Sequence, residues 1–507
     1  MNSFDVPLDP IPGDAPRLER QLGPFDAMML VVGSMIGSGI FIVSAESSRL
    51  VGAPGWLLVA WALAGVLTIT GALCCAELAA MMPRAGGQYV FLREAYGPAT
   101  GFLFGWALLL VVQSGTIAAV GMAFANFLGV LSPWVSGSNY LLEPIRIGRY
   151  AVSVSSQQCT AIAMILSLTF LNTRGLAVGK LIQNTFTFTK TAALIGLIVV
   201  GLTVGVNHGA AAFTSSWWNP GQNGWSPMQA QPGLVAGGGL ALAMMLGRAM
   251  VGPLFAQSAW NNVTFTAGEV RDPGRNLPRA LLGGCGLVVG LYLLANLAYV
   301  MTLSLNQLQS APQNRVATVA MQAVFGPLGT VLMAGAIVVS TFGCNNGLIL
   351  AGARVTYAMA RDGLFFRRVG TLNAHQVPAA ALTATGIWAA ALTLFRTASI
   401  DPATGRVTYG NVYTQLLEYI VSADLVFYVL MIGAVIVLRK RLRDLPRPFR
   451  TPGYPVVPLL YIALAVMLVV DLGYLAPSTS GAGYVLVLTG VPVYWAWRRA
   501  GQKARLP

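Results

Sequence analysis

The chain alternates between long apolar stretches and short polar segments. A helix needs about 20 mostly apolar residues to cross the hydrocarbon core of a membrane. By this criterion the sequence predicts an all-α polytopic membrane protein with twelve spanning helices. They lie at about 26–49, 55–82, part of 89–131, 152–171, 181–205, 236–267, 280–304, part of 322–360, 378–397, 412–438, 455–476 and 483–498.

The first stretch contains Gly33, Gly37 and Gly39 near its middle. Glycine is a poor helix former, so we expect the helix to break between Ile36 and Gly39. Broken backbone at membrane depth is tolerated where it lines a cavity or is buried in protein. The second half-helix, from near Ile40, would then aim its positive N-terminal end at a carboxylate. Close helix packing by a G-x-x-x-G pair is the alternative.

Transporters built from inverted repeats break twice, at matching places. If the first five and the next five spans are such repeats, a second break is expected in the stretch 236–267. Pro253 lacks an N–H group and clashes with the preceding turn. If this helix runs inward, its outer half ends near Phe255 with unpaired carbonyls that attract an ammonium group. A simple proline kink is the alternative. Polar side chains follow the proline at Gln257, Ser258, Asn261 and Asn262.

Charge placement supports this reading over a soluble or nucleic-acid-binding protein. Of the 507 residues 55% are hydrophobic and only 9% are charged, against about 25% charged residues in a typical soluble chain. With the N-terminus inside, 23 Lys and Arg lie on the inner side and six on the outer side. This asymmetry follows the positive-inside rule and predicts cytoplasmic termini in the cell membrane. No signal peptide opens the chain.

The spans divide the chain into two repeats and several connecting parts. We expect cytoplasmic tails at 1–25 and 499–507, and an outer loop at 206–235. The two remaining units are expected to be the inverted repeats 26–205 and 236–438, and two further helices follow at 439–498. The loop 131–150 and the loop 206–235 contain Trp and Pro and are expected to be caps at the membrane interface.

Metal and cofactor chemistry is not indicated. The two histidines, His208 and His375, lie in predicted loops. The cysteines lack C-x-x-C spacing, so we expect free, buried thiols and neither a metal site nor a cofactor. The five are Cys74, Cys75, Cys159, Cys285 and Cys344.

Three motifs in combination resemble a known family. They are Gly37-Ser38-Gly39-Ile40-Phe41, then Trp260-Asn261 followed by residues 268–279 (GEVRDPGRNLPR), and residues 447–455 (RPFRTPGYP). Together they are similar to the amino acid–polyamine–organocation superfamily, in particular to the L-type amino acid transporters and their bacterial relatives. The resemblance covers about residues 20–500.

This resemblance implies a leucine-transporter-type fold of five plus five inverted helices and two more. It also implies that the substrate carboxylate binds the N–H groups of Gly37, Ser38 and Gly39. The substrate amino group would bind the carbonyls of Ile36, Phe255 and Ala256. Phe255 matches an aromatic residue that closes over the substrate, and Asn261 matches a polar pocket residue.

Two departures from the family pattern concern the substrate and the partners. The family often has a Gly- and Tyr-containing break where this chain has Gln257-Ser258-Ala259, so the pocket for the substrate side chain differs, and Ser258 becomes a candidate binding residue. Animal members pair with a heavy chain through a cysteine in the loop between helices 3 and 4. Residues 131–150 contain no cysteine, so no disulfide-linked heavy chain is expected.

Four charged residues inside spans are candidates for gating or coupling, because charge at membrane depth is costly. Lys190 lies about 15 Å deep and matches a lysine that the L-type branch has where related sodium symporters hold a sodium ion; a structural ion pair is the alternative. Asp424 could carry a proton or favour a cationic substrate, or form a structural hydrogen bond. Glu46 and Arg248 lie about 10 Å outside their breaks and could pair as an outer gate.

Other polar residues in spans have simpler expected roles. Glu77 and Glu269 are expected to pair with loop arginines. Inter-helix hydrogen bonds are the expected role of a further set, which are weak site candidates: Gln113, Ser114, Asn345 and Asn346.

The sequence therefore predicts a secondary active transporter of neutral L-amino acids that works by alternating access. Sodium-independent exchange and proton-linked uptake both remain open as its mode of coupling. The alternative substrate is a cationic amino acid or a polyamine, bound with the help of Asp424 or Glu418. A membrane enzyme, a channel and a sensor are disfavoured, because no catalytic cluster, filter repeat or output domain is present in the sequence.

Overall fold

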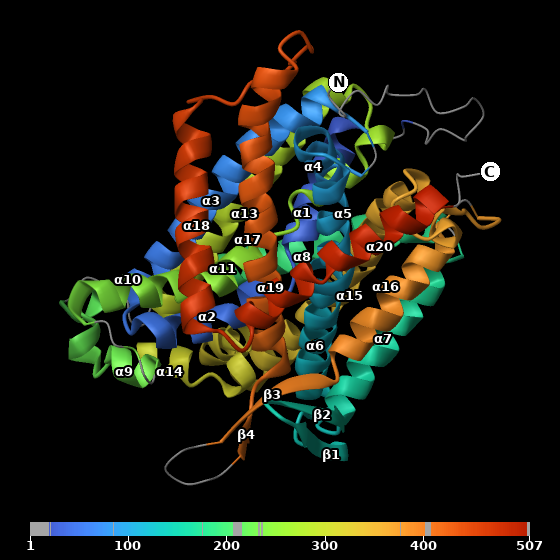
Figure 1. Ribbon diagram of the computed structural model, residues 1–507. Helices are drawn as coiled ribbons and strands as arrows, with labels where there is room; N and C mark the ends of the chain where they lie inside the picture. The colour runs from blue at the N-terminus through green and yellow to red at the C-terminus, as the bar shows by residue number, and fades with distance from the viewer. Residues whose placement is uncertain are drawn as a thin grey trace.

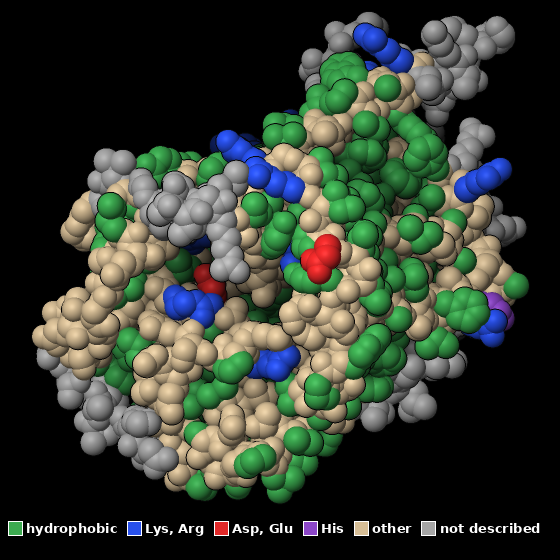
Figure 2. All heavy atoms as spheres, turned by 90° about the horizontal axis from the view of Figure 1, so that it is seen from below, with side chains coloured by type: hydrophobic (Ala, Val, Ile, Leu, Met, Phe, Trp, Pro, Cys, Tyr) green, Lys and Arg blue, Asp and Glu red, His purple; other side chains and the backbone are tan. Residues whose placement is uncertain are grey.

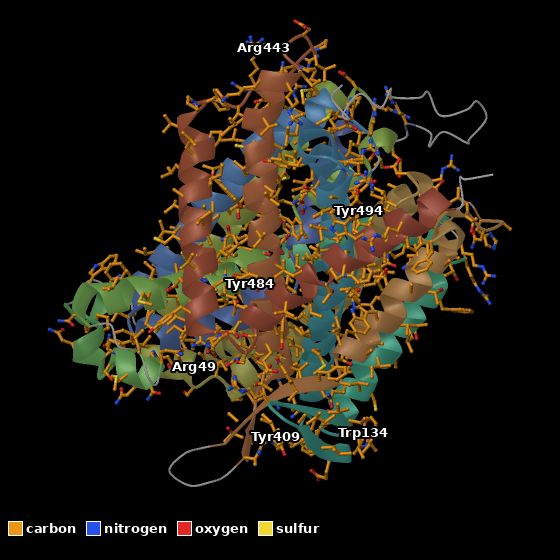
Figure 3. The ribbon with its side chains drawn as sticks, viewed as in Figure 1. Arg49, Trp134, Tyr409, Arg443, Tyr484 and Tyr494 are labelled. Carbon is orange, nitrogen blue, oxygen red and sulfur yellow. The ribbon has the colours of Figure 1, made fainter. Side chains whose placement is uncertain are left out.

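The computed structural model describes residues 20, 22–84, 86–174, 176–205, 215–231, 234, 237–375, 377–400 and 407–503, and the side chains of 176–185, 215, 367, 400 and 500–503 are outside the description. Most of the predicted N-terminal tail, residues 504–507 of the predicted C-terminal tail, and His208 therefore lie outside the described residues. The helices run between two ends of the molecule (Figure 1). We name them the basic end, which carries Arg443, and the sheet end, which carries Tyr409 and Trp134 (Figure 3).

The first half of the chain forms a run of helices that begin where the sequence supplies helix-starting residues. Pro54 and Pro98 each occupy the first helical position, where a missing N–H group costs nothing. Ser155 caps its helix together with Gln158. The elements are α1 (Pro24–Met35), α2 (Gly39–Val51), α3 (Pro54–Met81), α4 (Gln88–Tyr96), α5 (Pro98–Ala107), a π-helical turn (Leu108–Val112), α6 (Gln113–Leu131), α7 (Ser156–Asn172) and α8 (Leu176–Thr203).

The second half contains the longer helices. The elements are α9 (Pro227–Ala230), α10 (Gly238–Ala249), α11 (Val251–Ala256), α12 (Asn262–Phe265), α13 (Pro273–Thr302), α14 (Leu305–Gln309), α15 (Val316–Arg361), α16 (Ala379–Leu392), α17 (Val412–Arg441), α18 (Val456–Leu475), α19 (Ser480–Leu488) and α20 (Gly490–Lys503). Short 3-10 turns connect several of them.

The helices agree with the predicted membrane spans in position. Within the described residues, eight helical segments are long and apolar enough to cross a membrane. The pair α1 and α2, bent by 43°, raises the number to nine. The other three predicted spans correspond to α7, to α16 and to α19 with α20. The total of twelve therefore stays a prediction.

A small antiparallel sheet at the sheet end was not predicted. Its strands are β1 (Tyr140–Ile147), β2 (Tyr150–Ser155), β3 (Phe395–Ile400) and β4 (Val407–Tyr409), in the order β1-β2-β3-β4. Tyr150 pairs with Thr397 and Val152 pairs with Phe395. The loop 131–150, expected to be a simple cap, thus joins a sheet whose other half comes from the loop after α16.

The core lies between helices from the two halves. Helix α13 packs against α3 and α1, and α15 packs against α6 and α8. Glycines permit the closest approaches: a Cβ atom on Gly65 would lie 2.6 Å from Val289, and one on Gly284 would lie 2.7 Å from Val31. Since real Cβ atoms do not approach so closely, the observed packing of α13 against α3 and α1 requires glycine at these two positions.

Candidate functional site

The first helix breaks where the glycines predicted. Helix α1 ends at Met35, residues Ile36–Ser38 are not helical, and α2 begins at Gly39. The first N–H groups of α2 lack partners inside the helix, as in any helix. The N-terminal end of α2, which is the positive end of the helix dipole, therefore points into the protein interior.

Two tyrosines of α13 brace this break. The hydroxyl group of Tyr292 donates a 2.8 Å hydrogen bond to the carbonyl of Met35, and that of Tyr299 donates a 3.2 Å bond to the carbonyl of Ile40. Both tyrosines are fully buried. Neither tyrosine was predicted as a site residue, although two tyrosines seven residues apart on one face of an apolar helix are a usable signal.

The second break follows α11. Helix α11 ends at Ala256, and α12 begins at Asn262. Ala259, between them, has a φ of 65°, in the left-handed region that non-glycine residues rarely occupy. The hydroxyl group of Ser258 donates a 2.7 Å hydrogen bond to the carbonyl of Phe255. The same carbonyl also accepts a 3.0 Å hydrogen bond from the N–H group of Ser258, so residues of the break bond back to the end of α11 at Phe255.

The two breaks touch each other. A Cβ atom on Gly39 would lie 2.5 Å from the Cβ atom of Ala256, so only glycine fits there. Ser38 and Tyr413 of α17 join their hydroxyl groups at 3.0 Å. The ring of Phe255 packs edge-on against Tyr413, with ring centres 6.1 Å apart. The N-terminal end of α2 and the C-terminal end of α11 therefore meet beside the rings of Phe255 and Tyr413.

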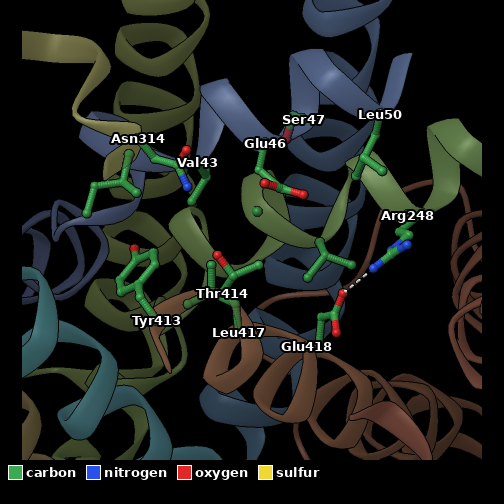
Figure 4. Close-up of a pocket in the computed structure, with 13 residues that line it drawn as sticks. Val43, Glu46, Ser47, Leu50, Arg248, Asn314, Tyr413, Thr414, Leu417 and Glu418 are labelled. Carbon is green, nitrogen blue, oxygen red and sulfur yellow. Dashed lines mark hydrogen bonds and ion pairs between the residues drawn. The ribbon is translucent and has the colours of Figure 1, made fainter. Parts of the chain in front are cut away.

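A pocket lies on the sheet-end side of this pair. Glu46, Arg248, Tyr413 and Glu418 are among the residues that line it (Figure 4). Seen from the sheet end, the molecule is hollowed near its middle, and charged side chains stand around the hollow (Figure 2). We name the pocket lined by Glu46, Arg248, Tyr413 and Glu418 the outer pocket.

The expected pair between Glu46 and Arg248 is not formed in this structure, although both residues line the outer pocket. Glu46 pairs instead with Arg49, one turn along the same helix. Arg248 forms a 3.0 Å ion pair with Glu418 of α17 (Figure 4). Glu46 and Arg248 therefore each pair with another residue in this structure. In place of the expected Glu46–Arg248 pair, an ion pair joins α10 to α17.

A second pocket lies beside the second break. Residues from α3, α11, the break, α17 and α18 line it, and none comes from α1 or α2. Asp424 and Ser258 both belong to it, with Trp260 and Tyr428 stacked at a centre distance of 5.3 Å. We name it the Asp424 pocket. Asn261 lies in neither pocket, because its amide donates a 2.8 Å hydrogen bond to Gln88.

Lys190 lies directly behind the first break. Its side chain is 1% exposed, and its ammonium group donates a hydrogen bond to the carbonyl of Gly33 in α1. The thiol of Cys344 lies nearby, 3.9 Å from the carbonyl of Ser34. Lys190 therefore holds its ammonium group against the backbone of the broken helix.

Toward the basic end, polar contacts join α4 to the residue that follows α15. The carboxylate of Asp362 pairs with Arg93 and accepts a 2.7 Å hydrogen bond from Tyr89, both from α4. Burial and this carboxylate raise the pKa of the Tyr89 hydroxyl. Burial alone would lower the pKa of Arg93, but the Asp362 carboxylate raises it overall. The links fasten α4 to the end of α15.

The two glutamates expected to pair with arginines do so. Glu269 pairs with Arg354 at 3.1 Å, although this arginine belongs to α15 rather than to a loop. Glu77 pairs with Arg439 of α17 at 2.6 Å, and with Arg447 of the following loop at 3.7 Å. The weak site candidates form hydrogen bonds between or within helices and line neither pocket: Gln113 to Leu348, Ser114 to Leu109, Asn345 to Ile117, and Asn346 with Asn172.

The five cysteines form no disulfide among the described residues. Cys159 is half-exposed, so the expectation that all five are buried is wrong for this one, which lies near the start of α7. Within the described part of the chain, no group of three or more His, Cys, Asp and Glu side chains could hold a metal ion.

Comparison with known proteins identifies the family. Residues 22–496 match the family described as amino acid permease. The chain belongs to this family. The permease is 29% identical over 485 residues to the serine/threonine exchanger SteT of Bacillus subtilis, a match that covers 95% of this chain and 98% of SteT. Its relatives are thus transporters rather than enzymes.

Two human proteins are similarly related to this permease. It is 30% identical over 488 residues to the large neutral amino acids transporter small subunit 2, with 95% of this chain and 81% of that protein covered. It is 29% identical over 453 residues to the b(0,+)-type amino acid transporter 1, with 89% and 82% covered. The resemblance to the L-type branch of the superfamily and its bacterial relatives is therefore confirmed, and the permease is a multi-pass membrane protein.

Proposed function

We propose that the permease is a secondary active transporter of neutral L-amino acids, which it carries across the cytoplasmic membrane by alternating access. Both termini would be cytoplasmic, so the sheet end would face outward. The outer pocket would then be the entrance, and the α4 links at the basic end would hold the inner path closed in this conformation.

The meeting of the two broken helices carries this proposal. An α-amino acid has a carboxylate and an ammonium group on one carbon atom. The N-terminal end of α2, at Ser38 and Gly39, offers N–H groups to the carboxylate. The carbonyls of Ile36, Phe255 and Ala256 would accept from the ammonium group. Since Gly39 and Ala256 are in contact, the two halves of the site are as close as the two groups of one amino acid.

The names of the relatives support a neutral substrate. Serine, threonine and large neutral amino acids all carry uncharged side chains, and these are the substrates that two of the relatives are named for. The break residues Gln257-Ser258-Ala259 would shape the space for the side chain.

A cationic substrate is the second candidate, and Asp424 is the observation that favours it. However, the cavity beside Asp424 has a volume of about 20 Å³, which is room for about one water molecule. A side chain that ends in an amine does not fit such a space without rearrangement of the pocket. The neutral substrate is therefore preferred.

Sodium would not be required, because Lys190 already supplies a fixed positive charge to the backbone of α1. Exchange and proton-linked uptake are the two remaining modes. A disulfide-linked heavy chain is not part of the proposal, since residues 131–150 contain no cysteine.

Counterflow in proteoliposomes tests the function. Vesicles loaded with an unlabelled amino acid should accumulate the same labelled amino acid from outside, with saturation at high concentration. A thermal-shift screen of the twenty amino acids and common polyamines should come first and identify the ligand, because a ligand that binds only the folded state stabilises it. Stabilisation by polyamines alone, without counterflow of any neutral amino acid, would overturn the neutral assignment.

A further inference from the structure

Asp424 is a buried acidic side chain that the proposed binding site does not use. It lies on α17, well inside a helix long and apolar enough to span a membrane, and is 6% exposed. Among the described residues that line its pocket, none is lysine, arginine or histidine. A bare carboxylate at this depth is costly, so something must neutralise it for at least part of the transport cycle.

Within the part of the chain that the structure describes, no fixed positive charge lines the pocket of Asp424. The titratable groups that face it are Tyr428 on α17, Tyr461 on α18 and, next to Tyr428, Cys75 on α3. These groups are uncharged near neutral pH in their usual state. The other acid of α17 near this depth, Glu418, lies in the outer pocket and is paired with Arg248.

The size of the pocket decides which neutralising partner fits. A volume of about 20 Å³ holds about one water molecule, so neither an organic ammonium nor a hydrated ion fits. A proton needs no space. The hydroxyl group of Tyr428 is buried close to the carboxylate without a well-formed hydrogen bond of its own, and it can exchange hydrogen bonds with a protonated or a charged carboxyl group.

The pocket is also connected to the substrate site. Ser258 lines the Asp424 pocket, and its hydroxyl group holds the carbonyl of Phe255, one of the carbonyls proposed for the substrate amino group. Trp260, on the far side of the break, stacks on Tyr428, four residues along α17 from Asp424. Movement of the second break, between α11 and α12, would therefore change the wall of the pocket and the access of water to Asp424.

We propose that Asp424 carries the proton that couples amino acid transport to the proton gradient, so that this permease is a proton symporter. The inference rests on the proposed transport function and decides between its two modes. The carboxylate takes a proton from water while the pocket is open to the outer side. It returns the proton to water on the inner side when the break has moved, so the step needs no other reactant.

The test measures proton entry and amino acid entry in the same proteoliposomes, with a pH-sensitive dye inside and labelled substrate outside. The wild-type protein should bring in about one proton with each amino acid, since one acidic group carries it. Asp424→Asn keeps the shape of the side chain but cannot hold the proton. It should lose the substrate-driven proton entry and retain counterflow.

Two matched variants make the result specific. Glu418→Gln removes the other acid of α17; it should slow the uptake of amino acid and of protons equally, so the proton-to-substrate ratio should stay that of the wild type. Asp424→Glu keeps an acid and should retain proton entry with an altered pH profile. This variant and the wild-type measurement keep the test decisive if Asp424→Asn does not fold.

Each outcome bears on one claim. Counterflow by the wild type without any proton entry would overturn the role of Asp424 and leave the transport function intact. Proton entry that persists in Asp424→Asn would also overturn it, because another group would then carry the proton. Failure of the wild type to show counterflow with any amino acid would instead refute the proposed function.

Discussion

The ammonium group of Lys190 donates a hydrogen bond to the carbonyl oxygen of Gly33, three residues before the first helix break. An ammonium group has three donors and is fixed to the chain. It can therefore satisfy backbone carbonyls that a sodium ion would otherwise coordinate, and unlike an ion it does not leave when the substrate does.

This contact predicts that transport does not depend on sodium. Initial uptake into proteoliposomes should be equal when sodium is replaced by choline or potassium. Lys190→Ala should lower uptake by about an order of magnitude while the protein remains folded, because an unpaired carbonyl in a dry interior is costly. A strict sodium requirement in the wild type would refute the assigned role of Lys190.

The contact between Gly39 and Ala256 gives a second prediction. Gly39→Ala should reduce amino acid binding at least several-fold, because the new methyl group has no space and must push the two breaks apart. Adding Ala256→Gly should restore only part of the loss, since it removes the Cβ atom at 2.5 Å and leaves the Cα atom of residue 256 at 2.8 Å from the new methyl group. Isothermal titration of the purified protein measures both effects.

Gly290→Ala is the control for this pair. Gly290 lies in α13, and nothing lies within 4 Å of the position that its Cβ atom would take. This variant should bind substrate as the wild type does. If the double variant binds no better than Gly39→Ala alone, contact between the breaks is not what limits binding.

The ion pair between Arg248 and Glu418 predicts an outer gate made of α10 and α17. The side chains are only 21% and 11% exposed, so loss of one partner leaves a poorly hydrated charge on the other. Arg248→Gln and Glu418→Gln should each slow uptake several-fold. The exchange Arg248→Glu with Glu418→Arg should recover part of the rate, as a double-mutant cycle would measure.

Glu143→Gln is the control for the outer gate, because Glu143 is an exposed acid on β1 and should have no effect. If the exchanged pair is no faster than the slower single variant, the ion pair does not act as a gate. The pairing of Glu46 with Arg248 in another conformation is tested by exchanging those two residues in the same assay.

The links of Asp362 predict how the inner path is held shut. Asp362→Asn removes the charge that holds Arg93 and weakens the bond from Tyr89, so α4 should detach more often from α15. Backbone amides of residues 88–96 should then exchange hydrogen for deuterium several-fold faster, since local opening governs exchange.

Asp444→Asn, an exposed acid in the loop after α17, is the matching control and should leave exchange in α4 unchanged. Unaltered exchange in Asp362→Asn would show that other contacts, such as Asn261 with Gln88, keep the inner path closed.

Local rules were enough to find the two helix breaks. Glycines at 33, 37 and 39 weaken a helix through their own backbone chemistry, so the first break is predictable without the fold. Pro253 indicated the second break only approximately, because it disrupts the turn before it, whereas it lies inside α11 and the break follows Ala256. The pairing of Glu77 with an arginine was also predictable, because a buried carboxylate near a basic loop has few other partners.

Features that depend on distant contacts were not predictable. Tyr413 reaches Ser38 from 375 positions away, and nothing near either residue indicates it. Glu46 and Arg248 looked like partners by depth alone, yet Arg49 and Glu418 lie closer. That Ser258 and Asp424 share one cavity also becomes visible only when α17 is placed beside the second break.

The sheet at the sheet end has a consequence for how such proteins change over evolution. Its central pair joins β2 to β3, strands from loops more than 200 residues apart in the chain. Successive residues of a strand point to opposite faces, so one inserted residue would turn every following side chain over. Insertions and deletions in these two loops should therefore be inherited as matched pairs. A chimaera that exchanges only one of the loops with a relative should misfold where an exchange of both does not.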